Sequence, residues 1–239
     1  MKQLQKTTLH GRFGNQDVRQ HMQTLSMCAH DNYPVSVLFL GAHSDDIELG
    51  CGGTVLSLLE QGQELDVHWV VFSSTPDRRF EAEKSADAFL KGAHRKEIIV
   101  KDFKDGFFPY VGAEIKNSFE ELKRRVNPDI VFTHYRHDLH QDHRVISELT
   151  WNTFRDHLIL EYEIIKYDGD VGSPNCFVHL SEEICAKKNR IILDNFITQQ
   201  SHPWFSEDSF LALQRLRGVE SNAPGKLAEA FYGRKLVIG

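Results

Sequence analysis

The stretch VSVLFLGAHSDDIELG, residues 35–50, contains an apolar run that ends abruptly in a cluster of ionisable side chains. The run at 35–40 is rich in apolar and β-branched residues, which is typical of a strand buried on both faces of a sheet. The ionisable residues that follow begin at His43 and end at Glu48. Ligands of open parallel sheets bind beyond the carboxyl ends of the strands. The stretch therefore predicts a buried strand with a polar binding site at its end.

The rest of the chain alternates strand-like and helix-like segments. The pattern predicts further strands at 65–72, 97–100, 129–134, 162–167 and 176–180, and helices at 17–29, 52–61, 80–90, 113–126, 145–154, 187–200 and 226–231. Such a β-α-β-α order implies a parallel sheet with helices on both faces and right-handed crossovers. We therefore expect a single-domain α/β fold, a Rossmann-like, three-layer α/β/α arrangement with a parallel sheet. Residues 34–239 would form this domain, and residues 1–33 an N-terminal extension that packs on its outside.

Composition limits the classes of function. The chain has 239 residues, of which 41% are apolar and 26% charged, as in ordinary soluble globular proteins. Its net charge of -6 offers no basic stripe for phosphate backbones, so we expect no nucleic acid partner. The 4 cysteines form no Cys-x-x-Cys pair, which indicates a reducing compartment. With no signal peptide and no integral membrane segment in the pattern, we expect a cytoplasmic location.

A second cluster of ionisable residues follows the predicted strand at 129–134. It contains His134, His137, His140 and His143, and Asp142 lies next to the last of these. Two strand ends of one sheet would bring this cluster close to the first. Catalytic zinc takes three ligands from His, Asp or Glu, keeps one position for water, and lowers the pKa of that water from about 15.7 to about 7. The two loops together therefore predict a metal centre suited to hydrolysis of an amide or ester.

The two clusters resemble the signature motifs of a known family. The first reads Ala-His-Ser-Asp-Asp at 42–46 and the second His-Gln-Asp-His at 140–143. They are similar to the Ala-His-Pro-Asp-Asp-Glu and His-x-Asp-His motifs of the PIG-L/LmbE-like deacetylases, and the likeness extends from about Val35 into the C-terminal region. The resemblance implies a metal-dependent hydrolase that removes the acetyl group from an N-acetylated amino sugar of the N-acetylglucosamine type, free or conjugated.

The resemblance also implies a role for each motif residue. The metal ligands would be His43, Asp46 and His143, and the catalytic residues Asp45, His140 and Asp142. In this scheme Asp45 is the general base, His140 polarises the carbonyl oxygen or assists the leaving amine, and Asp142 orients a histidine. The adjacent carboxylates of Asp45 and Asp46 cannot point the same way from an extended loop, which fits the division of roles. The implied cofactor is Zn²⁺, although Fe²⁺, Mn²⁺ or Co²⁺ also suit such donors. The expected partner is a small molecule, and the oligomeric state stays open.

This sequence departs from the family motif at two positions. Ser44 stands where the family usually has proline, and Ile47 stands where it often has glutamate, with Glu48 one place later. The serine loses the fixed φ of proline and could loosen the loop slightly. Neither position is an implied ligand or the implied base.

Several side chains keep two interpretations. Arg78 and Arg79 could bind a substrate oxygen or lie in a solvated turn, and the aromatic loop at 102–110 could line a pocket or cap the core. His134 and His137 could support the ligands, Asp138 could contact substrate, and His202 could serve packing or function.

The function has alternatives as well. The same centre could serve an amidase or esterase that acts on a non-sugar metabolite. A non-catalytic carbohydrate-binding metal protein would keep the donors, although it would not need Asp45.

Overall fold

The computed structural model describes residues 33–237. Its strands are β1 (Val35–Gly41), β2 (Leu65–Val71), β3 (Arg95–Val100), β4 (Ile130–His134), β5 (Leu158–Tyr162), β6 (Cys176–His179) and β7 (Ala228–Gly233). Its helices are α1 (Asp46–Glu60), α2 (Pro76–Phe89), α3 (Gly112–Arg125), α4 (Gln141–Thr153), α5 (Glu182–Asn195) and α6 (Glu207–Glu220), with short 3₁₀ turns η1 (Phe108–Tyr110) and η2 (Ile197–Gln199). Among the helices of this described range, none has the length and apolar content needed to cross a membrane.

The strands form one seven-stranded sheet in the order β3-β2-β1-β4-β5-β7-β6. Strands β3, β2, β1, β4 and β5 pair in parallel. The strand order reverses at β1, which lies between β2 and β4, and such a switch point is where open α/β sheets bind ligands. The carboxyl ends of β1 and β4 are therefore neighbours.

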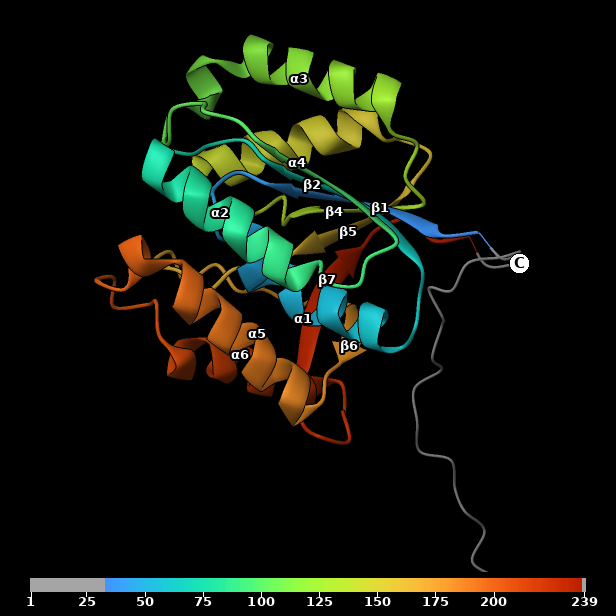
Figure 1. The fold of residues 1–239 in the computed structure, drawn as a ribbon, viewed down its shortest axis with the longest axis vertical. Coiled ribbons are helices and arrows are strands. Elements are labelled where there is room, and N and C mark those ends of the chain that lie inside the picture. The colour runs from blue at the N-terminus through green and yellow to red at the C-terminus, as the bar shows by residue number, and fades with distance from the viewer. Residues whose placement is uncertain (1–32, 238–239) are drawn as a thin grey trace, which may run out of the picture.

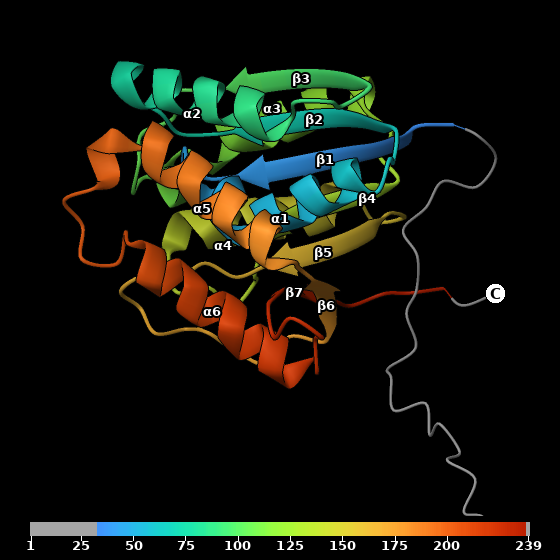
Figure 2. The ribbon, with the colours of Figure 1, turned by 60° about the horizontal axis from the view of Figure 1, so that its bottom comes forward.

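Helices cover both faces of the sheet (Figures 1 and 2). One apolar core includes Phe39, Trp69 and Phe89 and is closed by α1, α2 and α5. The core on the opposite face includes Leu38, Phe72 and Phe119 and is closed by α3 and α4. In β1, Val37 to Leu40 are fully buried, and their side chains alternate between the two cores, as expected for a strand covered on both faces.

The predicted fold class is confirmed: the described chain is a single α/β domain with helices on both faces of a mostly parallel sheet. One part of that prediction was wrong, because the sheet is mixed. Strand β7 runs antiparallel to both β5 and β6. The predicted helix at 17–29 lies outside the described residues, and the boundary after residue 33 stays a prediction.

Two strands near the C-terminal end of the sheet differ from their predictions. We expected a strand at 162–167, but β5 ends at Tyr162, where its register with β4 also ends. We expected a helix at 226–231, since Ala-Glu-Ala is a good helix-forming sequence, yet residues 228–233 are β7. A tertiary position between two strands overrides local propensity here.

Most helices begin earlier than predicted, and the missed signals are caps. Thr75 caps α2 ahead of Pro76, Ser181 caps α5, and Ser206 caps α6, each by accepting a hydrogen bond from a backbone N–H of the first turn. Helix α6 was missed altogether. Its Ser-Glu-Asp start at 206–208 is a typical N-terminal signal that the sequence pattern did contain.

Helix α1 begins at Asp46, six residues before the predicted start at residue 52, so the glycine pair at 52–53 lies in the middle of the helix. The absence of a Cβ lets Phe89 pack against Gly52 and brings the carboxylate of Glu229 onto Gly53. Glu229 accepts hydrogen bonds from the backbone N–H groups of Gly53 and Thr54 and from Nζ of Lys188. This buried carboxylate ties α1 to β7 and α5.

Gly50 shows how closely α1 lies against the sheet. A Cβ at this position would lie 2.2 Å from a ring carbon of Tyr162, whose hydroxyl donates to the carbonyl of Leu40. We expect Gly50→Ala to destabilise the protein by about 1–3 kcal/mol, because the buried ring must shift. Urea unfolding followed by circular dichroism measures this change. Gly112→Ala is the matched control, since nothing lies within 4 Å of its added Cβ, and it should be neutral or slightly stabilising. Equal effects of the two substitutions would contradict the packing argument.

Candidate metal centre

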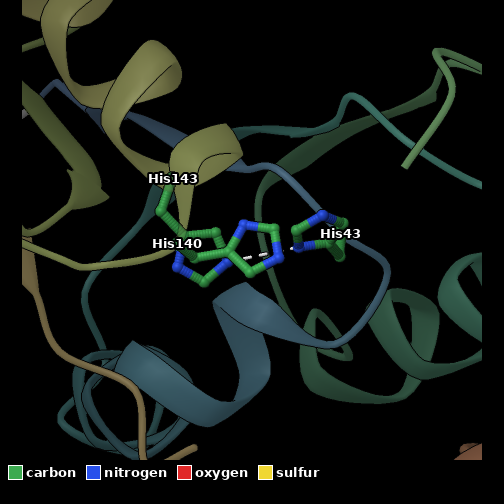
Figure 3. A group of neighbouring side chains, drawn as sticks. All are labelled: His43, His140 and His143. Carbon is green, nitrogen blue, oxygen red and sulfur yellow. Dashed lines mark hydrogen bonds between the residues drawn. The ribbon is translucent and has the colours of Figure 1, made fainter. Parts of the chain in front are cut away.

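Two loops meet at the carboxyl edge of the sheet. Strand β1 leads through residues 42–45 into α1, and strand β4 leads through residues 135–140 into α4. The two strands are direct neighbours, with Phe39 opposite Phe132. Figure 3 shows the result, in which the ring of His43 from the first loop faces the rings of His140 and His143 from the second segment. Residues 100 positions apart in the chain thus come into contact, as His43 and His143 do.

Asp46 lies at the centre of this cluster. It is the first residue of α1 and is only 4% exposed, so its carboxylate benefits from the positive end of the helix dipole. One oxygen, Oδ2, accepts a hydrogen bond of 2.6 Å from the backbone N–H of His43 and lies 3.2 Å from Nε2 of His134. The other, Oδ1, lies 3.5 Å from Nε2 of His143. The start of α1 therefore places one carboxylate among three imidazoles.

The donor atoms of His43, Asp46 and His143 have the spacing of ligands to one cation. Nδ1 of His43 lies 3.2 Å from Nε2 of His143 and 3.4 Å from Oδ2 of Asp46. Zinc binds nitrogen and carboxylate oxygen at about 2.0–2.2 Å, which puts tetrahedral ligands about 3.4 Å from one another. Pair by pair, the three side chains predicted as ligands therefore have this spacing, with Asp46 facing His43 through Oδ2 and His143 through Oδ1.

The second nitrogen of each of these histidines faces a carboxylate. Nε2 of His43 lies 3.0 Å from Asp105 and 3.3 Å from Asp142, and Nδ1 of His143 lies 2.9 Å from Asp138. Histidines that bind metals typically donate their other N–H to a carboxylate, which fixes the tautomer and raises ligand basicity. Both histidines have this arrangement.

Other combinations of donors also cluster. Among the described residues, three other groups have donor atoms close enough together to hold a metal: His43 with His140 and His143, Asp46 with His134 and His143, and His43 with Asp105 and Asp142. His140 uses Nδ1 to accept from the backbone N–H of Asp142, which caps α4. His134 accepts the backbone N–H of Ala42 at Nε2, and its ring stacks on that of His143 at 3.9 Å. These two contacts favour a supporting role for His134 and leave Asp46 as the anionic donor.

The pKa values follow the burial of the cluster. Burial lowers the pKa of His43 and of His143, but the neighbouring carboxylates together outweigh it and raise both above the ordinary value of 6.5. These carboxylates are Asp46, Asp105 and Asp142 at His43, and Asp46 and Asp138 at His143. Burial and the neighbouring His143 lower the pKa of His134 to about 4, so this ring is neutral at physiological pH.

The carboxylates titrate in the opposite direction. Burial raises the pKa of Asp46, but the surrounding histidines outweigh it and lower it well below its usual range. The hydrogen bond from His43 lowers the pKa of Asp105. The pKa shifts therefore favour ionised carboxylates beside the protonated rings of His43 and His143. A metal cation that bound to these two rings would displace their protons.

Asp45 points to a different partner from its neighbour Asp46. It occupies the position before α1 but makes no side-chain cap, and its Oδ1 accepts a hydrogen bond of 2.8 Å from Nη2 of Arg78. Arg78 belongs to the first turn of α2, on the same edge of the sheet. Helix geometry, and not an extended loop as expected, separates the two carboxylates. Arg78 is therefore a site residue whose interpretation the sequence had left open.

The structure places the other residues that the sequence singled out either outside the cluster, as with His137 and His202, or buried within it, as with Asp138 and Asp142. The exposed ring of His137 contacts Tyr135, and the exposed ring of His202 stacks against Trp204. Asp138, considered as a substrate contact, is 2% exposed and bonded to His143. Asp142 is fully buried and accepts from the backbone N–H groups of Gly106 and Phe108.

Sequence reasoning missed the part that Asp105 plays. This residue lies in the loop after β3, next to Gly106, whose φ of +79° favours glycine. The Asp-Gly pair indicated a turn, but no local signal places its carboxylate against His43.

The chain is similar to known deacetylases in sequence motifs and in fold. The model of the family PIG-L, GlcNAc-PI de-N-acetylase, matches residues 38–154. Among solved structures, the N,N'-diacetylchitobiose deacetylase from Pyrococcus horikoshii is 21% identical with a TM-score of 0.63, covering 83% of this chain and 83% of its own. The zinc-inhibited form of the teicoplanin deacetylase Orf2 is 14% identical with a TM-score of 0.59, covering 83% and 96%.

The same fold also occurs with another activity. GalB, the 4-carboxy-2-hydroxymuconate hydratase from Pseudomonas putida KT2440, is 19% identical with a TM-score of 0.68, covering 86% of this chain and 98% of its own. At these identities the structural likeness shows the fold alone. The family match covers both loops of the cluster and confirms the resemblance that the motifs predicted, since residues 38–154 match the PIG-L family model.

Proposed function

We propose that this protein is a metal-dependent, zinc-type de-N-acetylase that hydrolyses the acetamide of an N-acetylated amino sugar, free or conjugated, to amine and acetate. The observation that supports it best is the paired arrangement of His43 and His143. Each presents one nitrogen to the shared Asp46 and the other to a supporting carboxylate. The family match and the likeness to the diacetylchitobiose and teicoplanin deacetylases support the choice of bond.

In this proposal His43, Asp46 and His143 hold the cation. Zinc bound there would polarise the acetamide carbonyl and make a neighbouring water acidic. Asp45 accepts the proton of the attacking water, because it is a carboxylate beside the ligands that neither binds the cation nor caps the helix. Arg78 fixes the orientation of Asp45 through the 2.8 Å hydrogen bond.

His140 supplies a hydrogen-bond donor to the developing oxyanion. Its Nδ1 accepts a backbone N–H, so the neutral ring carries its proton on Nε2. Burial, together with the charges of His143 and His43, lowers the pKa of His140, which favours the neutral ring. The half-buried ring lies against those of His43 and His143, with centroids at 4.8 and 4.6 Å, next to the proposed cation. Such fixed donors stabilise oxyanions in acyl transfer.

Acetate release from a panel of N-acetylated amino sugars and their conjugates tests the proposal. Chelator-treated protein should release little acetate, and added zinc should restore release. Non-sugar amides, esters and an unsaturated hydroxy-acid should be included, since GalB is named a hydratase on the same fold. Zinc-dependent turnover of only these would contradict the sugar assignment, and sugar binding without any turnover would indicate a binding protein.

Asp45→Asn tests the general base. The amide keeps the size of the side chain but cannot accept the proton, so we expect kcat to fall by about 10²–10⁴-fold. Zinc binding should be retained, because Asp45 is not among the proposed ligands. The matched control is Asp87→Asn, an exposed carboxylate paired with Lys96. A fully active Asp45→Asn enzyme would show that the base is another group.

The raised pKa values of His43 and His143 predict that zinc affinity depends on pH. Folded-state pKa values above 6.5 keep these rings protonated into the neutral range, and each must lose its proton to bind metal. The apparent affinity should therefore rise as the pH increases above about 6.5, the ordinary pKa of histidine. Competition with a chromophoric chelator measures it. The same slope is expected for His68→Gln, which removes a surface histidine paired with Glu97. An affinity independent of pH would contradict the ligand assignment.

A further inference from the structure

A largely buried lysine and its carboxylate partner lie behind the second motif. Lys166 and Asp170 belong to the connection between β5 and β6, and their side chains are only 10% and 8% exposed. Nζ of Lys166 lies 2.6 and 2.5 Å from the two carboxylate oxygens of Asp170. The same Nζ lies 3.1 Å from Oδ2 of Asp138. Lys166 is therefore held between two carboxylates that come from different loops.

This pair reaches three successive residues of the loop that precedes α4. Oδ2 of Asp138, the oxygen next to Lys166, also accepts from Nδ1 of His143. Oδ1 of Asp138 accepts the backbone N–H of His140 at 2.8 Å. Oδ2 of Asp170 accepts the backbone N–H of Leu139 at 2.7 Å. The contacts link the β5–β6 connection to one proposed ligand and to the proposed oxyanion donor.

We propose that Lys166, anchored by Asp170, is a positioning residue that holds Asp138 and thereby orients both His143 and His140. This inference rests on the proposed function, since it assigns these two histidines their roles. Lys166 itself is 10% exposed and touches no reacting group, so it acts only through Asp138.

The burial of Asp138 explains why a positively charged side chain is needed beside it. Asp138 is 3% exposed, and a buried carboxylate is costly unless it is paired. Without Lys166, Oδ2 of Asp138 would have only the Nδ1–H group of His143 as a donor, and that ring is neutral when it binds a metal. Lys166 adds a fixed positive charge, and Asp170 prevents the flexible lysine stem from turning away. The network therefore keeps Asp138 in one orientation both when His143 is protonated and when it binds a metal.

A second buried lysine provides a matched comparison. Lys188 is 2% exposed and joins Glu229 to the carbonyl of Leu49, within the packing of α1, α5 and β7. Loss of Lys188 should lower stability, but it should leave the second motif in place. Lys166 and Lys188 thus separate a positioning role from the general cost of removing a buried ion pair.

The experiment compares Lys166→Met, Lys166→Arg, Asp170→Asn and Lys188→Met with the unchanged protein. We measure zinc affinity by chelator competition, kcat and KM on the best acetylated substrate, and stability by urea unfolding. Lys166→Met should weaken zinc affinity and lower kcat, each by about 10–100-fold, with a smaller change in KM. Lys166→Arg should recover part of both losses, and Asp170→Asn should show a weaker effect in the same direction. Lys188→Met should keep zinc affinity and kcat while it loses stability.

Two results would overturn the proposal. One is a Lys166→Met protein whose zinc affinity and kcat lie within twofold of the unchanged protein. The other is an equal loss of zinc affinity in Lys188→Met, which would show that destabilisation alone is responsible. If Lys166→Met fails to fold, the zinc affinity of Asp170→Asn decides the matter in the same way. An unchanged protein that binds no zinc would instead contradict the proposed function, and this inference would fall with it.

Discussion

A single buried carboxylate, that of Asp46, determines how the carboxyl edge of the sheet is arranged. Removing a charge from water is costly unless partners replace the lost solvation. Asp46 finds them in the start of α1, in the backbone N–H of His43 and in the side chain of His143. Each of these groups must then be held in turn, which explains the further carboxylates and the backbone donors that surround the cluster.

The sequence motifs predicted the chemistry of this edge better than its architecture. The apolar run before His43 and the strand before His134 were enough to place two motifs at neighbouring strand ends. Hydrogen bonds between distant segments could not be predicted, because they depend on the conformation of loops, which leaves no periodic pattern in the sequence. Asp105 approaches His43 from the loop after β3, and Lys166 approaches Asp138 from the connection after β5. Neither residue stands in a recognisable motif.

The predicted fold failed where tertiary position decides the local structure. The segment Ala-Glu-Ala-Phe at 228–231 favours a helix by composition, yet it fills the gap between β5 and β6. Helix starts were also placed late. The motif carboxylates Asp46 and Asp142 lie in the first turns of α1 and α4, ahead of the predicted helix starts at residues 52 and 145. The same carboxylates that identify a site also suit a helix N-terminus, so the two signals coincide.

The position of β7 has a consequence for how the domain forms. Strand β7 pairs with β5 on one side and with β6 on the other. Residues 180–227, which separate β6 from β7 in the chain, must therefore be synthesised before the sheet can extend beyond β5. Pairings of such long sequence separation close slowly, because chain entropy must be lost before the contacts form. During synthesis, β5 and β6 would have no β7 to pair with until residues 228–233 have left the ribosome. Until then the open edge of β5 would expose unpaired backbone groups, and this edge is where a nascent chain would be most exposed to intermolecular pairing.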